Sequence, residues 1–346
     1  MKSYRSFLFV LIAIILCLTS CSQGKASQSE NEVKLILGAY TTPREAYGEI
    51  IPLFQEYWLD TTGQHVTFEE SYLGSGAQSR AVVEGFEADI VALSLEADVN
   101  RIQDAGLITH DWKSGDHKGI ITTSIVSFAV REGNPKNIQD WENLAQPGLE
   151  ILTPNPNTSG GAMWNILAVY GAALRGQIDG VPGDSPEAAA EFLKQVLANV
   201  SVMDKAARDS ILNFEKGIGD LAITYENEIL VGKSSGQVYE RIIPSSTILI
   251  ENPIAIIDAS VDKHGTREVA EAFLDFLCTD QAQEIYAKHG LRVVNAQVAA
   301  DHEADYPPVE DLFTVDYFGG WDQIMGEIFG EDGVYNRAIL QVQRGE

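Results

Sequence analysis

Beyond residue 32 the chain alternates short apolar runs with amphipathic stretches, and this alternation restricts the possible fold more than any other feature. Five apolar runs read as strands, several of them ending at glycine or small polar residues: residues 33–40, 66–71, 88–93, 150–153 and 221–224. The best-marked helix begins at Thr42-Pro43-Arg44-Glu45, a capping box with proline at the first helical position. Strands that alternate with helices form βαβ units, so the sequence predicts an α/β fold with parallel sheets.

The length of this region predicts two domains, because about 314 residues exceed what one hydrophobic core usually serves. Two further apolar stretches, residues 120–131 and 247–258, would carry the chain from one lobe to the other and back. We therefore expect a discontinuous lobe 1 of residues 33–125 and 248–346, and a lobe 2 of residues 126–247. The helix-like tail, residues 317–340, is expected to pack across lobe 1 or the hinge.

The first twenty residues read as an export signal. Lys2 and Arg5 precede an unbroken apolar run of twelve residues, shorter than the about 20 that span a bilayer. The run ends at Leu18-Thr19-Ser20-Cys21, which resembles a lipobox, the sequence at which bacterial lipoproteins are cleaved and acylated. The resemblance implies a lipid anchor on Cys21 and an extracytoplasmic address; an ordinary signal peptide that contains a cysteine is the alternative. Residues 21–32 are polar and are expected to form a flexible tether.

Cysteine usage leaves no partner for a disulfide. Cys17 departs with the signal and Cys21 is the expected lipid site, so Cys278 stands alone. It follows the apolar pattern of residues 272–277 and is therefore expected in the core.

The charge excludes two classes of partner. Once residues 1–20 are removed, 22 basic residues face 50 acidic ones, a net charge of −28. Such a surface repels nucleic acid and anionic lipid headgroups. Any anion must therefore be bound by local, short-range groups.

Four loops between an expected strand and an expected helix are small, uncharged at their tips and mostly hydroxylated. They are residues 40–42, 74–76, 157–161 and 205–207. In open α/β sheets, ligands bind beyond the carboxyl ends of the strands. Each helix start presents unpaired N–H groups and a partial positive charge, so converging helix starts form an anion site that needs no lysine or arginine.

One of these loops carries a family resemblance. Residues 154–165 read PNPNTSGGAMWN, which resembles the signature of prokaryotic sulfate-binding proteins, type II periplasmic binding proteins of ATP-driven (ABC) importers. Further segments resemble the same family in the same order: residues 74–78, 88–91, 131–136, 217–220 and 226–228. The resemblance implies two α/β lobes joined by a two-strand hinge, with the ligand in the cleft and a membrane permease as partner.

The family's site, carried over residue by residue, implies a sulfate held by neutral donors. The implied contacts are Thr41, Ser75, Ser159, Gly160, Gly161, Ala207 and Tyr225. Arg208 matches an arginine that supports the site from behind, bonded to backbone. Two positions depart from the family: Thr41 replaces an aspartate that uses its backbone N–H, and Tyr225 replaces a tryptophan that uses its indole N–H.

Several alternatives stay open from the sequence. Thiosulfate, molybdate and tungstate are acceptor-only anions like sulfate, whereas hydrogen phosphate carries a proton that needs an acceptor. A serine hydrolase would need a base beside Ser75 or Ser159, but the six histidines fall at no triad-like or metal-like spacing. A surface adhesion lipoprotein is the remaining rival. The preferred interpretation is a monomeric binding protein without catalytic residues, cofactor or metal.

Overall fold

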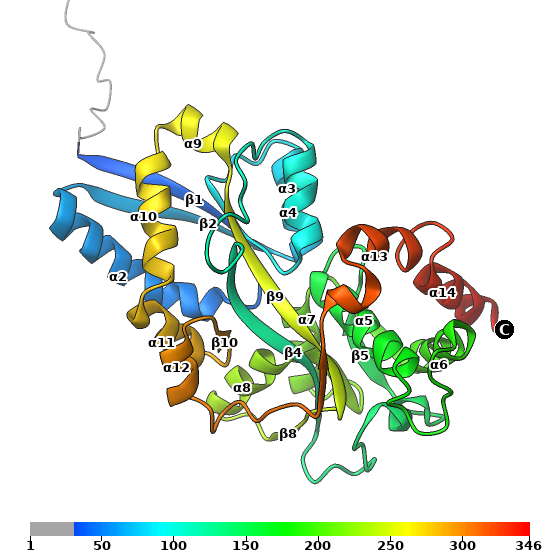
Figure 1. Ribbon diagram of the computed structural model, residues 1–346. Coiled ribbons are helices and arrows are strands. Elements are labelled where there is room, and N and C mark those ends of the chain that lie inside the picture. The colour runs from blue at the N-terminus through cyan, green and yellow to red at the C-terminus, as the bar shows by residue number, and fades with distance from the viewer. Residues whose placement is uncertain (1–30) are drawn as a thin grey trace, which may run out of the picture.

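The computed structural model describes residues 31–346 (Figure 1). The predicted export signal, Cys21 and most of the predicted tether lie outside this range. Within it, no helix is both long enough and apolar enough to cross a bilayer.

Eleven strands join into one strongly twisted sheet. They are β1 (Glu32–Tyr40), β2 (His65–Leu73), β3 (Ile90–Ala92), β4 (Ile120–Arg131), β5 (Ile151–Pro154), β6 (Val200–Asp204), β7 (Leu221–Tyr225), β8 (Tyr239–Ile242), β9 (Ser246–Ile256), β10 (Arg292–Val293) and β11 (Asp311–Phe313). The main path runs β2-β1-β3-β9-β4-β7-β5-β6. Each predicted strand is present. β1 pairs in parallel with β2 and β3, and β5 with β6 and β7, which confirms the α/β fold.

The helices cover both faces of this sheet (Figure 1). They are α2 (Arg44–Thr62), α3 (Ser75–Val83), α4 (Glu96–Asp104), α5 (Gly160–Leu174), α6 (Pro186–Ala198), α7 (Ala207–Glu215), α8 (Glu226–Ser234), α9 (Asp258–His264), α10 (Arg267–Leu277), α11 (Asp280–Lys288), α12 (Ala296–Asp301), α13 (Trp321–Glu327) and α14 (Val334–Arg344), with 3₁₀ turns at Trp141–Ala145 and Val315–Phe318. The predicted capping box does not form, because α2 begins after Pro43 without a side-chain cap and the Thr42 hydroxyl has no hydrogen-bond partner within residues 31–346.

Two long antiparallel strands join the lobes (Figure 1). β4 pairs with β9 over Ile120–Ile125 and with β7 from Val126 onward, so it leaves one lobe and enters the other within a single strand. β9 pairs with β3 through its last three residues, Ile254–Ile256. Below, lobe 1 means β1 to β3 with α2 to α4 and α9 to α11, and lobe 2 means β5 to β7 with α5 to α8.

In lobe 1 an aromatic cluster fastens α2 and α10 to the sheet. Phe54 of α2 lies 4.9 Å from Phe273 of α10, measured between ring centres, and Phe68 of β2 lies 5.0 Å from Phe273. The buried side chains of α10 recur every three or four residues and end at Leu277. Cys278 caps this helix beyond that stripe and is exposed, so the expectation that it is a core residue was wrong.

Most of the C-terminal tail packs on lobe 2, and α13 also contacts lobe 1, at α4, as expected. α14 lies against α6, and the tail's buried side chains share one core with α5 and β7 (Figure 1). The Trp321 ring meets the Trp164 ring of α5 edge to face, 5.0 Å between centres. Arg175 forms an ion pair with Asp311 at the start of this segment. The amphipathic pattern of the tail predicted that it packs, but not which lobe offers the matching apolar face.

Trp321→Ala should lower the free energy of unfolding by about 3–5 kcal/mol, the usual cost of deleting a buried aromatic ring. Trp321 is 5% exposed and anchors α13 against Trp164. Urea unfolding measures the change. The matched control is Leu340→Ala in α14, which is 47% exposed and should cost under about 0.5 kcal/mol. Equal effects at the two positions would contradict the packing of the tail.

Candidate ligand-binding site

A small cavity lies between the two lobes, beneath the crossing strands. Its empty volume is about 160 Å³ when the gaps between the lining atoms and the adjoining solvent are included. Eleven residues line it, and none has a charged side chain: Tyr40, Thr41, Thr42, Gly74, Ser75, Ser94, Ser159, Gly160, Gly161, Ala207 and Tyr225. The lobe 1 residues follow the carboxyl ends of β1, β2 and β3, and the lobe 2 residues follow β5, β6 and β7. The cavity thus lies where ligands bind in α/β sheets.

All seven residues that the sequence singled out as contacts line this cavity. Ser75 and Ala207 are the first residues of α3 and α7, and Gly160 and Gly161 are the first two of α5. Three helix starts therefore converge on one space. Their side chains are small, so the space is bounded largely by backbone and hydroxyl groups.

The helix starts supply free N–H groups. Within the described residues, the backbone N–H groups of Gly160, Gly161 and Ala207 donate to no acceptor. This is the expected state of N–H groups in a first helical turn. Ser159 differs from these residues, because its N–H donates to the carbonyl oxygen of Asn155 at 2.9 Å. Its hydroxyl is left as its donor toward the cavity.

The hydroxyl of Ser75 is already engaged. It donates to Oδ2 of Asp98 at 2.6 Å and accepts from the N–H of Ser94 at 2.9 Å. The other oxygen of Asp98 accepts from Arg101 at 2.6 Å. Asp98 does not line the cavity, so its carboxylate is held one residue behind the wall and satisfied there. An anion that binds at Ser75 competes with Asp98 for the hydroxyl proton.

Ser94 was missed from the sequence. It follows β3 in lobe 1, and its Oγ lies 2.5 Å from Oη of Tyr225, at the end of β7 in lobe 2. Trp164 of α5 donates its indole N–H to the Ser94 carbonyl oxygen at 3.0 Å and to its Oγ at 3.1 Å. The rule that ligands sit beyond strand ends applies to Ser94 as well as to Ser75, and it could have identified this residue.

Tyr40 was also missed. It is the last residue of β1, it lines the cavity, and its hydroxyl has no hydrogen-bond partner among the described residues. Burial raises its pKa well above the ordinary value, as it does for Tyr225. Both phenols therefore keep their protons at any physiological pH, and both can only be neutral groups in the cavity wall.

Arg208 lies behind the cavity and does not line it. From α7 in lobe 2 it donates to the buried carboxylate of Glu228 at 2.6 Å, and across the cleft to Glu45 at 2.8 Å and to the Thr42 carbonyl oxygen at 3.2 Å. The expectation of backbone bonding alone was incomplete, because two carboxylates hold this side chain. Burial raises the pKa of Glu45, but its bonds to Arg208 outweigh burial and leave that pKa below its ordinary value.

Glycines allow the two lobes to approach so closely. A Cβ on Gly160 would lie 2.7 Å from Oγ of Ser94 and 2.9 Å from Leu95, both of lobe 1. A Cβ on Gly74 would lie 2.4 Å from the Thr158 carbonyl oxygen of lobe 2. These distances are shorter than real Cβ contacts, so the closed arrangement requires glycine at both positions.

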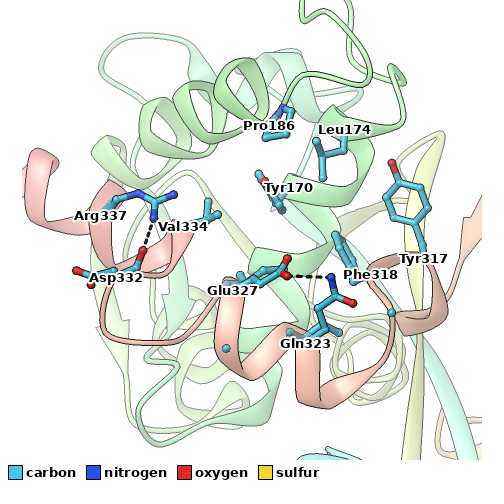
Figure 2. Close-up of a pocket in the computed structure, with 14 residues that line it drawn as sticks. Tyr170, Leu174, Pro186, Tyr317, Phe318, Gln323, Glu327, Asp332, Val334 and Arg337 are labelled. Atoms are coloured by element: carbon cyan, nitrogen blue, oxygen red, sulfur yellow. Dashed lines mark hydrogen bonds between the residues drawn. The ribbon is translucent and has the colours of Figure 1, made fainter.

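A larger and more open hollow lies elsewhere, between α5 and the C-terminal tail (Figure 2). Tyr170 and Leu174 form one wall, and the facing wall carries Gln323, which donates to Glu327 at 2.9 Å. It contains none of the predicted contact residues. We therefore place the candidate site in the small cavity between the lobes.

Comparison with known proteins identifies the family of the chain. The model of the bacterial extracellular solute-binding protein family matches residues 35–292. A sulfate-binding protein of Synechocystis sp. is 40% identical over 97% of each chain, and a thiosulfate-binding protein of Escherichia coli is 34% identical over 88% of this chain and 91% of its own. The solved sulfate-binding protein SubI of Mycobacterium tuberculosis superposes with a TM-score of 0.77 at 36% identity, covering 84% of this chain and 98% of its own. The chain belongs to the bacterial extracellular solute-binding proteins and, among them, to the sulfate-binding protein family.

Proposed function

We propose that this protein captures sulfate outside the cytoplasm and delivers it to the membrane permease of an ABC importer. One observation carries the proposal: the cavity between the lobes is bounded by three helix starts and by hydroxyl groups, with no charged side chain in its wall. Such a wall can strip the water from an anion inside a strongly negative protein, because backbone N–H groups and helix dipoles replace its hydration.

The donor set favours sulfate over phosphate. Fully ionised sulfate only accepts hydrogen bonds, which suits the free N–H groups of Gly160, Gly161 and Ala207. Hydrogen phosphate needs an acceptor for its proton, but the carboxylate of Asp98 does not line the cavity and is bound by Ser75 and Arg101. A mismatch of this kind can discriminate by about 10⁴ to 10⁵. Six or seven bonds to a charged ligand, at about 1.5–3 kcal/mol each and less the cost of ordering it, are enough for micromolar affinity.

The proposal includes the way the protein is displayed. Cleavage before Cys21 and acylation of that cysteine would tie the body to the membrane through residues 22–32, and the body would act as a monomer without cofactor or catalytic group. Closure of the lobes on sulfate would report occupancy to the permease. The cross-cleft bonds of Arg208 to Glu45 and of Trp164 to Ser94 support such a closed state.

Calorimetric titration of residues 22–346, which include the whole described structure, tests the ligand. Sulfate should bind with a dissociation constant of about 1 μM, the scale estimated above. Thiosulfate, which has a sulfur in place of one oxygen, and molybdate, which is larger, test how strictly the cavity selects the composition and size of sulfate. Phosphate at the same concentration should give no saturable heat. The proposal fails if no dianion produces heat, and it is wrong in its ligand if phosphate alone does.

A further inference from the structure

The Ser94 and Tyr225 hydroxyls form a pair that spans the cleft. Their oxygens lie 2.5 Å apart, both residues line the cavity, and they are 1% and 2% exposed. Ser94 belongs to lobe 1 and Tyr225 to lobe 2. The hydrogen bond between them therefore exists only when the lobes are closed.

Trp164 gives this pair a direction. Its indole N–H can only donate, and it lies 3.1 Å from Oγ of Ser94 and 3.0 Å from the Ser94 carbonyl oxygen. A hydroxyl that accepts a hydrogen bond becomes a stronger donor, because successive bonds polarise one another. The favoured order is therefore Trp164 to Ser94, and Ser94 to Tyr225.

One of the two hydroxyl protons of Ser94 and Tyr225 is left free to point into the cavity. Two hydroxyls carry two protons, and one of them lies between the two oxygens. The second has no acceptor among the described residues, since neither hydroxyl makes a further donating contact to protein. With Ser94 donating to Tyr225, the remaining proton is that of the phenol, which borders the cavity.

We propose that Ser94 is a positioning residue for the anion: it donates to Tyr225 across the cleft and thereby turns the phenol of Tyr225 into a single donor directed at the bound ligand. The inference rests on the proposed binding of a tetrahedral dianion. This arrangement favours a ligand that only accepts hydrogen bonds. Oη of Tyr225 already accepts a hydrogen bond from Ser94, so toward the ligand the phenol acts mainly as a donor. The arrangement also couples the donor to closure, since the pair is assembled from both lobes.

A double-mutant cycle tests the pair on the chain of residues 22–346. Tyr225→Phe removes the donor and keeps the ring, and Ser94→Ala removes the group that orients it. Each change should weaken sulfate binding by about tenfold to a hundredfold, the worth of one hydrogen bond to a charged group. The double variant should be no weaker than the weaker of the two single variants, because Ser94 acts through Tyr225.

The outcomes separate this inference from the proposed function. If the unaltered chain binds no dianion, the proposed function fails, and the role proposed for Ser94 fails with it. If the unaltered chain binds sulfate but the single variants bind equally well, or if their losses multiply in the double variant, the pair does not act as one donor. Ser127→Ala, a buried serine of β4 without a hydrogen-bond partner, is the control and should leave the dissociation constant unchanged. Urea unfolding of each variant checks that the fold is retained.

Discussion

Gly160→Asp should abolish sulfate binding while leaving the protein folded. A side chain at this position would collide with Ser94 and Leu95 of the opposite lobe, where a Cβ alone would come within 2.7 Å and 2.9 Å. The aspartate would also place a negative charge against a doubly negative ligand at the start of α5. The collision acts on the closed state alone, because the colliding atoms belong to different lobes. We expect a loss of at least about a thousandfold in affinity, or about 4 kcal/mol, in calorimetric titration.

Two companion variants divide this loss into its parts. Gly160→Ala keeps the steric collision without the charge and should bind more weakly than the unaltered protein but better than Gly160→Asp. Gly48→Asp in α2, where a Cβ would meet nothing within 4 Å, should bind sulfate normally. The free energy of unfolding in urea should change by less than about 1 kcal/mol for Gly160→Asp, since the open form avoids the collision with the opposite lobe. Retained affinity in Gly160→Asp would place the ligand outside this cavity.

The sequence predicted much of this site because its parts are local. Each small loop could be identified from a strand that precedes it and a helix that follows, and carboxyl ends of parallel strands meet at one edge whatever the rest of the fold does. Ser75, Gly160 and Ala207 belong to this class. They needed no knowledge of which residue faces which across the cleft, and the structure brings all of them to one cavity.

What could not be predicted depends on contacts between distant segments. The strand-end rule could have placed Ser94 at the cavity, but its partners Trp164 and Tyr225 belong to the other lobe, and no local pattern encodes that pairing. The amphipathic tail could have been buried on either lobe, and the structure packs Trp321 against Trp164 and α14 against α6 of lobe 2. Cys278 continues an apolar pattern in the sequence, yet the helix ends one residue earlier and leaves it exposed.

Arg208→Met should weaken both the fold of lobe 2 and the binding of sulfate. Arg208 is the cation beside Glu228, whose side chain is 1% exposed, and removing it would leave a buried carboxylate without a partner. Breaking a buried ion pair from one side costs about 3–5 kcal/mol. The same guanidinium reaches Glu45 and the Thr42 carbonyl oxygen in lobe 1, so the closed state loses a link as well. Urea unfolding and calorimetric titration measure the two losses separately.

Glu45→Gln isolates the link between lobes from the stability of lobe 2. It keeps Arg208 paired with Glu228, so the free energy of unfolding should change little. The sulfate dissociation constant should rise about threefold to tenfold, because the ion pair with Glu45 is partly exposed and acts only in the closed state. Arg80→Met is the matched control, because Arg80 also crosses the cleft but bonds only to the carbonyl oxygen of Asn157. It should affect binding less than Glu45→Gln does.

Acidity provides an independent measurement of the same link. The bonds to Arg208 lower the pKa of Glu45 in the closed protein below its ordinary value of 4.5, so closure favours the ionised form. The contribution of Glu45 to closure is therefore complete above about pH 4.5 and is lost as the pH falls through the lowered pKa. Sulfate affinity should hold steady near neutrality and fall in acid, and Glu45→Gln should fall less steeply. Identical acid profiles for the two proteins would show that Arg208 and Glu45 do not hold the cleft closed.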